Sequence, residues 1–454
     1  MGVQASRLFE FKFKKTRCKI DNRVTSCWES GIYAYGRFAE NKDKIEEGDM
    51  SAKEMDRREF LRSSATGLGA FVFLLPASQR AGLAKEAQQR DPKNYPQRVL
   101  GKTGIRLPAI TMGVMNSDNP SLIRAALDAG MMHLDTAHAY MRGRNEEAVG
   151  EVIKGRPRDS FFLSTKVGLP KDETTGIYDQ SATEAAFLSR LDISLKRLGL
   201  DYVDILYHHN VWKKEAVLYE PIMNAMAKAK KAGKVRFTGI STHRNEPEAI
   251  LTAVDSHFYD VVLTAYNFRQ KHQEEVKKAI ARAAEAGLGV VGMKAMGGSP
   301  QSNYGRGREP EEAQAGLKWV LQDANVHMVI AGFTTFDQLE MDVKIMQDMS
   351  LTKREKAYLQ KAISMTSLYC QGCEKCLGSC LQKLPIPDLM RAYMYLYGYR
   401  NIGAAQDLLL SLHLPANVCN DCETCPVGCP SGFPVAKKIA DLIRLRDVPP
   451  EFIA

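Results

Sequence analysis

The long middle of this 454-residue sequence lacks cysteine. No cysteine occurs between Cys27 and Cys370, although the chain has 10 in all, and the last eight lie in two dense groups near the carboxyl end. A secreted scaffold held together by disulfides would spread its cysteines along the chain, so this class is disfavoured. The distribution indicates bound metal in the carboxyl-terminal part.

Two further absences narrow the class. The formal net charge is only +9, and Lys and Arg are interspersed with Asp and Glu, not gathered into a basic stripe with aromatics, which disfavours nucleic-acid binding. No Gly-x-Gly-x-x-Gly follows a candidate strand, which makes a doubly wound dinucleotide-binding sheet the weaker alternative. With 44% hydrophobic and 25% charged residues, the composition is that of a globular protein with room for two or three domains.

The uncharged apolar run at 65–77 is also short. At about 13 residues it cannot span a bilayer, but it suits the apolar region of a signal peptide. Arg57 and Arg58 precede it and make it resemble a twin-arginine export signal. A buried helix with a basic start is the alternative, which glycines and a proline within the run disfavour.

Residues 1–49 do not fit such a signal, which should begin only a few charged residues before its apolar run. We expect the natural start at Met50 or Met55, with 1–49 a mis-assigned start or a disordered extension. Residues 50–90 would be the signal and a linker, and the mature chain would begin near Lys85. The expected partner is the twin-arginine export machinery, and the expected location is the periplasm or another extracytoplasmic compartment.

From Arg98 onward, short apolar runs alternate with longer amphipathic stretches such as 182–198 and 273–286. The runs predicted to be strands are 109–114, 131–135, 161–166, 203–208, 235–240, 261–266, 290–294 and 328–331. Eight strand-helix repeats over about 250 residues are typical of a (β/α)8 TIM barrel. We therefore predict an α/β barrel over residues 95–350.

In such a barrel the chemistry lies at the carboxyl ends of the strands. The second run ends in Asp135, the third in Lys166 and the fourth in His208 and His209. A lysine that points inward there needs a partner, for which Asp135 on the neighbouring strand is suited. Tyr140 follows on the next loop and can share this pocket. The alternative is that Asp135 only caps a turn and Tyr140 is a surface aromatic.

The order of these residues resembles the aldo-keto reductase family, in which an Asp-Thr-Ala-x-x-Tyr segment carries two of four catalytic residues. That segment is 135–140 here, and further similarity lies at 100–104 (Leu-Gly-Lys-Thr-Gly), 201–204 (Asp-Tyr-Val-Asp) and 233–236 (Gly-Lys-Val-Arg). The resemblance covers roughly residues 98–349. It implies the catalytic tetrad Asp135, Tyr140, Lys166 and His209.

The chemistry explains the tetrad. Hydride transfer to a carbonyl creates an alkoxide, and Tyr140 is the candidate acid that protonates it. A free phenol, with a pKa of about 10, is a reluctant donor at neutral pH, so we expect Lys166, held by Asp135, to lower that pKa. His209 would hydrogen-bond the carbonyl oxygen. We expect His208 to be an ordinary core histidine.

The resemblance also implies a nicotinamide cofactor, NAD or NADP, extended across the barrel mouth. Tyr266 would stack on the nicotinamide ring, and Ser241 would hold its carboxamide. Backbone N–H groups after the seventh and eighth strands would bind phosphates. The residues expected there are Gly297, Gly298, Gly332, Thr334 and Thr335.

Two positions depart from the family pattern. Thr242 and His243 follow Ser241, where the family usually has Asn. Near Thr334 and Glu340 the family usually has a Lys and an Arg, which neutralise the 2′-phosphate of NADP. The sequence therefore favours NAD at least as much as NADP.

The cysteines form two quartets in residues 351–454. Each has the spacing Cys-x-x-Cys-x-x-Cys-x-x-x-Cys, and only the second is followed by proline, at Pro430. This spacing resembles the bacterial ferredoxin pattern and not a zinc ribbon. We therefore predict a helical ferredoxin-like domain with two 4Fe–4S clusters, whose tyrosines between the quartets (393, 395, 397 and 399) form helix core.

In ferredoxins the fourth cysteine of each run ligates the other cluster. The resemblance thus implies one cluster on Cys370, Cys373, Cys376 and Cys429, and another on Cys419, Cys422, Cys425 and Cys380. Together, the segments resemble exported iron-sulfur aldo-keto reductases, acting on a carbonyl or alcohol with a redox protein as a further partner. The alternative is an electron-transfer module whose barrel is only a docking scaffold.

Overall fold

The computed structural model describes residues 95–454 except 173–174, 298–309, 365–368, 371, 420–421, 423 and 454. The predicted export signal, the start at Met50 or Met55 and the glycine at 298 lie outside the described residues. Within this part of the chain, no helix is both long and apolar enough to cross a membrane.

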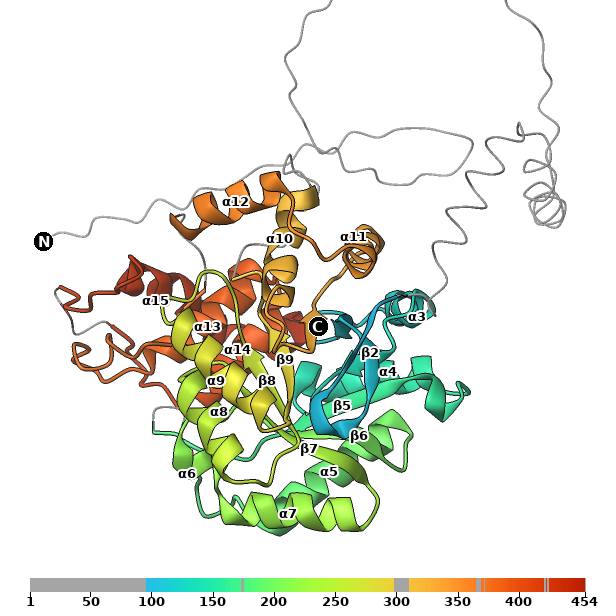
Figure 1. Cartoon of the computed structure of the whole chain (residues 1–454). Helices are drawn as coiled ribbons and strands as arrows, with labels where there is room; N and C mark the ends of the chain where they lie inside the picture. Colours follow the sequence, from blue (N-terminus) through green and yellow to red (C-terminus); the bar gives the residue numbers. More distant parts are fainter. Residues whose placement is uncertain are drawn as a thin grey trace, which may run out of the picture. The chain divides into compact units, whose positions relative to one another are not determined.

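Eight parallel strands close into a barrel in the order β10-β3-β4-β5-β6-β7-β8-β9 (Figure 1). Their bounds are β3 Ile110–Gly113, β4 His133–Asp135, β5 Phe162–Val167, β6 Val203–His208, β7 Val235–Thr242, β8 Val261–Ala265, β9 Gly289–Met293 and β10 Met328–Ala331. Each coincides with a predicted strand to within a few residues. The predicted (β/α)8 barrel is confirmed.

Amphipathic helices follow the strands. The barrel helices are α3 Pro120–Asp128, α4 Arg144–Ile153, α5 Glu184–Leu198, α6 Lys214–Val217, α7 Glu220–Lys231, α8 Glu246–Asp255, α9 Gln273–Glu285, α10 Pro310–Leu321 and α11 Phe336–Gln347. The sequence explains where these helices end. In α5 the Thr183 hydroxyl caps the first turn, and Gly199, with a left-handed φ of 65°, caps the last. The two predicted helical stretches are therefore α5 and α9.

The barrel has two apolar layers. Side chains inside the strand ring form one core, which includes Ile205, Leu263 and Val291, and a larger core fills the space between strands and helices. A hairpin of β1 (Gln97–Val99) and β2 (Arg106–Pro108) adds Leu100 and Leu107 to the inner core. Leu100 touches the start of β9, so the hairpin closes the amino end of the barrel and leaves the carboxyl end for the site.

The chain continues beyond the barrel as a set of helices. The first, α12 (Lys353–Ser364), packs on α10 through a small apolar cluster and a buried ion pair between Lys318 and Glu355, 2.9 Å apart. The remaining elements are α13 Ile386–Tyr393, a π-helical turn η6 Met394–Gly398, α14 Ile402–Ser411 and α15 Val435–Ile443. These last elements and the cysteine loops share a separate core, and we call them the cysteine domain (residues 369–453).

The cysteine domain contacts the carboxyl-end loops of the barrel. Arg142 pairs with Asp407 at 2.6 Å, and Asn401 donates to Asn116 over 3.1 Å. The buried guanidinium of Arg244, in the loop after β7, donates to Glu374 over 2.7 Å. The domain is therefore positioned over the end of the barrel where the predicted tetrad lies.

Candidate active site

Asp135 and Lys166 end neighbouring strands and are both buried. The Lys166 ammonium donates to Asp135 Oδ1 and, over 2.7 Å, to the carbonyl of Thr136. Ser164 Oγ donates to the other carboxylate oxygen over 2.6 Å and is in turn 3.0 Å from His133 Nε2. The predicted lysine–aspartate partnership is present, and the two strands fix both partners.

The loop that carries Tyr140 is held in place by hydrogen bonds from α5 and from the residues that begin α4. Arg197 on α5 donates to the carbonyl of His138 over 2.9 Å and pairs with buried Glu146 at 3.2 Å. Gly143, with φ at 97°, allows this approach, since a Cβ there would lie 2.2 Å from the Arg197 guanidinium carbon. Asn145 Nδ2 donates to the carbonyl of Val114 over 2.7 Å. The buried polar residues that begin α4 therefore position the loop.

All four tetrad residues line one cavity of about 770 Å³ at the carboxyl end of the barrel. The Lys166 ammonium lies 4.8 Å from the ring centre of Tyr140, and the Tyr140 and His209 rings meet edge to face with centres 6.0 Å apart. A carbonyl bound between phenol and imidazole would thus face a proton donor and a hydrogen-bonding group. His208 points away into the barrel wall and bonds to Tyr178, as expected of a core histidine.

Burial determines the protonation states of Tyr140 and His209. It raises the pKa of Tyr140, and the charge of Asp135 adds to the shift, so the expected lowering of this pKa is wrong. Burial disfavours the charged phenolate and is the larger of the two causes, which the prediction from sequence did not weigh. Enclosure, with Lys166 next among the causes, holds the pKa of His209 well below its ordinary value. Near neutral pH, therefore, Tyr140 keeps its proton and His209 is uncharged.

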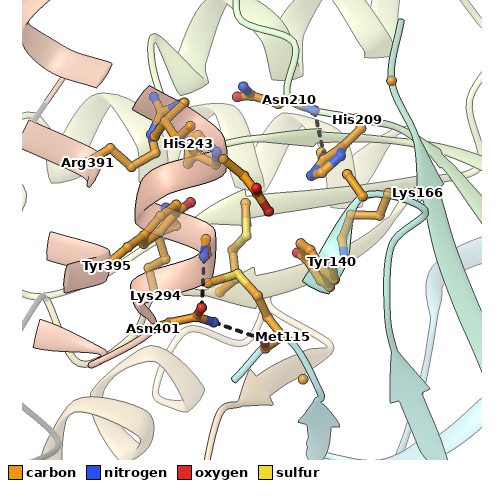
Figure 2. Close-up of a pocket in the computed structure, with 18 of the residues that line it drawn as sticks. Met115, Tyr140, Lys166, His209, Asn210, His243, Lys294, Arg391, Tyr395 and Asn401 are labelled. Atoms are coloured by element: carbon orange, nitrogen blue, oxygen red, sulfur yellow. Dashed lines mark hydrogen bonds between the residues drawn. The ribbon is translucent and has the colours of Figure 1, made fainter. Parts of the chain in front are cut away.

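The cysteine domain forms one wall of the cavity. Figure 2 shows Arg391, Tyr395 and Asn401 across the cavity from Tyr140 and Lys166. The tyrosines between the cysteine quartets were expected to be helix core, but Tyr395 and Tyr399 line the site. Sequence reasoning missed these wall residues, because nothing in the local pattern indicates that a segment some 230 residues downstream packs on the barrel mouth.

The residues expected to bind the cofactor differ in their position relative to the cavity. Ser241 and Gly332 line the cavity, as the resemblance implies. Tyr266 does not, and its predicted stacking on nicotinamide is wrong for this structure. Its ring packs on Trp319 with centres 4.9 Å apart, and its hydroxyl lies 3.2 Å from Asp323, in the layer between strands and helices. The alternation of β8 turns it outward.

The expected phosphate-binding residues are also placed differently. Gly297 does not line the cavity and packs on Arg269, where a Cβ would come within 2.6 Å of a side-chain carbon. Thr334 and Thr335 lie directly before α11. The Thr334 N–H donates to the Gln338 side chain, and the Thr335 hydroxyl accepts from the Gln338 N–H and so caps the helix. Their predicted role is therefore not supported by the geometry, because helix capping engages these groups.

None of the eight cysteines of the two quartets forms a disulfide. Among the described residues, no group of three or more His, Cys, Asp or Glu side chains could hold a metal ion. Burial raises the pKa of Cys370 to about 12 and that of Cys376 to about 11. The predicted metal ligands are thus present in one domain but are not drawn together around one ion.

Two basic or polar groups in the cavity were not anticipated. Lys294 follows β9 with a left-handed φ of 57°, and enclosure lowers its pKa to about 7. His243, two positions after Ser241, has a buried Nδ1 with no hydrogen-bond partner among the described residues. The left-handed backbone conformation of a lysine directly after a strand cannot be predicted from the sequence alone.

Asp342 on α11 also lines the cavity, and burial raises its pKa to about 8. The folded protein then holds a proton that the unfolded chain releases near pH 4, so the free energy of unfolding should fall as pH rises from 4 to 8. We expect Asp342→Asn to remove this slope and to raise the free energy of unfolding at pH 8 by about 1–3 kcal/mol.

Urea unfolding of both proteins at pH 6 and pH 8 measures this. Asp337→Asn, at an exposed position of the same helix, is the control and should leave the slope of the native protein. Equal pH dependence in the native protein and Asp342→Asn would contradict the prediction.

A parallel barrel with these four residues at its carboxyl end has the arrangement expected of an oxidoreductase whose site lies at the barrel mouth. The model of the Aldo/keto reductase family matches residues 111–315. The chain is 27% identical over 333 residues to L-glyceraldehyde 3-phosphate reductase of Escherichia coli strain K12, covering 60% of this chain and 95% of that protein. It is 36% identical over 155 residues to aldo-keto reductase YhdN of Bacillus subtilis, covering 34% and 45%.

Among solved structures, aldo-keto reductase AKR11C1 from Bacillus halodurans matches 62% of this chain and 99% of its own, with a TM-score of 0.49 and 23% identity. The family model and the curated relatives show that the barrel is similar to aldo-keto reductases. The protein is accordingly an NAD(P)-dependent oxidoreductase.

Proposed function

We propose that the protein interconverts a carbonyl compound and its alcohol, using a nicotinamide cofactor in the cavity at the barrel mouth. The observation that carries this proposal is the convergence of Tyr140, His209 and the Lys166–Asp135 pair at one end of a cavity of about 770 Å³. A cavity of this size suits a small organic substrate together with part of a dinucleotide.

The residues have distinct roles in this proposal. The bound cofactor supplies or accepts the hydride. Tyr140 gives its proton to the carbonyl oxygen as charge develops there, and His209 hydrogen-bonds the same oxygen as a neutral imidazole. Lys166 stabilises the phenolate that remains on Tyr140, and Asp135 keeps the ammonium in place.

The lining of the cavity supports NAD more than NADP. Ser241 and the buried, unpartnered Oδ1 of Asn210 offer polar groups suited to a carboxamide. Beyond β10, Gly332 and Asp342 line the cavity before the cysteine domain begins, and among the described residues this stretch adds no cation to it. A 2′-phosphate there would lack the Lys or Arg that it needs.

We also propose that the cysteine domain binds two 4Fe–4S clusters. The spacing supports this, and so do the neighbours of the thiols. After burial and backbone contacts, Cys373 and Cys429 raise the pKa of Cys376, whereas Cys380, Cys422 and Cys425 raise that of Cys419. This grouping corresponds to the crossed ligation of ferredoxins.

Contacts between the two cysteine loops support the same grouping. Gln382, two residues after Cys380, accepts from the backbone of Cys419 over 2.7 Å and donates to Asn417 over 3.0 Å. Thiolates at separate corners of a cubane stand farther apart than thiolates on a single ion, so such loops need not converge on one point. The clusters would pass electrons between the site and a redox protein.

Export belongs to the same proposal. The paired arginines before the apolar run at 65–77 support twin-arginine transport, a route that carries folded proteins, and clusters are assembled before export. An exported enzyme has no access to the cytoplasmic pool of free dinucleotide. It must therefore retain its cofactor or exchange electrons through the clusters.

The second candidate is an electron-transfer module. It is favoured by one observation, namely that the cysteine domain lies over the barrel mouth while Tyr266 does not line it. In that case the clusters would carry the function without a bound dinucleotide.

Anaerobic purification from the exported fraction tests these alternatives in one sample. We expect a brown protein with about eight irons and about eight sulfides per chain. We also expect nicotinamide dinucleotide, NAD more than NADP, to be released on denaturation and identified by mass. Clusters without nucleotide, and no fluorescence change on adding NADH or NADPH, would favour the electron-transfer module. Zinc in place of iron would overturn the cluster assignment.

A further inference from the structure

The cavity contains a basic group that the tetrad does not use. Lys294 enters from the barrel, and Arg391 enters from α13 of the cysteine domain. Both residues, together with His243, also line the small adjoining space beside Cys370. Figure 2 shows Arg391 near His243, and Lys294 near Tyr395.

Lys294 has no carboxylate within ion-pair distance in the described part of the chain. The centre of the Tyr395 ring lies 5.7 Å from the ammonium, and Arg391 and Glu246 act on the pKa of Lys294 with opposite signs. The carboxylates near Arg391 already form ion pairs. Asp388 pairs with Arg391 at 2.9 Å and with Arg244 at 3.4 Å. Glu374 pairs with Arg244 at 2.7 Å. These two acids are shared by the two arginines, and among the described residues neither forms an ion pair with Lys294.

The acids on the cavity wall have other partners or are protonated, and two of them, Asp172 and Asp179, accept hydrogen bonds from Thr175 and Ser181 of their own loop. Asp135 is bonded to Lys166, Asp407 pairs with Arg142 at 2.6 Å, and burial leaves Asp342 largely protonated at neutral pH. Because burial lowers the pKa of Lys294 to about 7, the ammonium is only partly formed near neutral pH, and a bound anion would favour its charged form.

Tyr395 connects this group to the reaction centre. Its ring stands against Lys294, and its hydroxyl is close enough to Lys166 to act on the pKa of that lysine, which burial and Asp135 dominate. Both Tyr395 and Tyr140 act on Tyr399. Lys294, Tyr395 and the proton donor Tyr140 thus line the same cavity.

We propose that Lys294 and Arg391 form an anion subsite for a carboxylate of the substrate, so that the enzyme acts on carbonyl compounds that carry an acid group. This proposal rests on the carbonyl reduction proposed above. The pyrophosphate of a dinucleotide is the competing occupant of such a subsite, and the measurements below distinguish it from a substrate carboxylate. Arg391 also makes the cysteine domain part of substrate recognition.

The test uses 4-carboxybenzaldehyde and 4-carbamoylbenzaldehyde, which have nearly the same shape and differ in charge. We expect kcat/KM for the acid to exceed that for the amide by about 10- to 100-fold, the usual range for a charged hydrogen bond. Lys294→Met should bring the ratio close to one, and Lys294→Arg should restore most of it. Lys277→Met, on the exposed face of α9, is the matched control and should keep the native ratio.

Two further measurements separate the alternatives. The Kd for NADH, from nicotinamide fluorescence, should change less than about threefold in Lys294→Met. A tenfold weaker Kd with equal losses for acid and amide would assign the lysine to the cofactor and overturn the proposal. If neither aldehyde is reduced, the proposed function fails, and calorimetric binding of the two aldehydes still tests the subsite. Tighter binding of the acid, lost in Lys294→Met, supports it, and equal binding overturns it.

Discussion

Tyr140→Phe should lower kcat for carbonyl reduction by about 10²- to 10⁴-fold, the usual contribution of a positioned general acid. The substitution removes one oxygen and leaves the ring against His209 and Lys166, so the cavity keeps its shape. Because the hydroxyl is the proton donor, the loss should appear in kcat and not in the affinity for NADH. Oxidation of NADH in the presence of an aldehyde, together with fluorescence titration of the nucleotide, measures both quantities.

Tyr202→Phe is the matched control. Its ring lies under Arg158, 4.1 Å from the guanidinium carbon, and it does not line the cavity. The same change of hydroxyl to hydrogen should therefore leave kcat within about twofold of the native value, as is usual for surface substitutions. If Tyr140→Phe retained more than a tenth of the activity, another group would have to supply the proton. Lys166→Met is a less clean test, because it leaves Asp135 buried without its partner.

The sequence predicted the barrel well because its signals are local and repeated. Each strand is an apolar run of a few residues, and burial on both faces of a parallel sheet selects that pattern eight times in succession. The tetrad could be found for the same reason, since Asp135 and Lys166 end such runs. Tyr266 could also have been placed correctly, because its alternation with Leu263 turns it away from the inner core.

The remaining wall of the site could not be read from local patterns. Arg391 and Tyr395 reach the cavity only because the cysteine domain packs on the barrel mouth, and this packing depends on contacts between residues more than 100 positions apart. The direction of the Tyr140 pKa was also out of reach. It depends on burial and on the charge of Asp135, which only the three-dimensional arrangement sets.

Arg244→Met should destabilise the contact between the cysteine domain and the barrel by about 3–5 kcal/mol, the usual cost of breaking a buried ion pair. Arg244 is almost fully buried and lies over the Trp212 ring at 4.7 Å. It binds Glu374 and Asp388, both in the cysteine domain, and Gly372 approaches it closely with φ at 62°. Without the guanidinium, buried Asp388 would lose one of its charged partners and keep its pair with Arg391.

Arg142→Met provides the comparison, because Arg142 also joins the barrel to the cysteine domain. Its pair with Asp407 is about as short, at 2.6 Å, but the side chains are 50% and 33% exposed, so we expect a loss below about 1 kcal/mol. Hydrogen exchange should show faster opening of α13 and of the loop at 372–380 in Arg244→Met and near-native protection in Arg142→Met. Equal effects of the two substitutions would mean that apolar packing, and not the buried arginine, holds the cysteine domain over the active site.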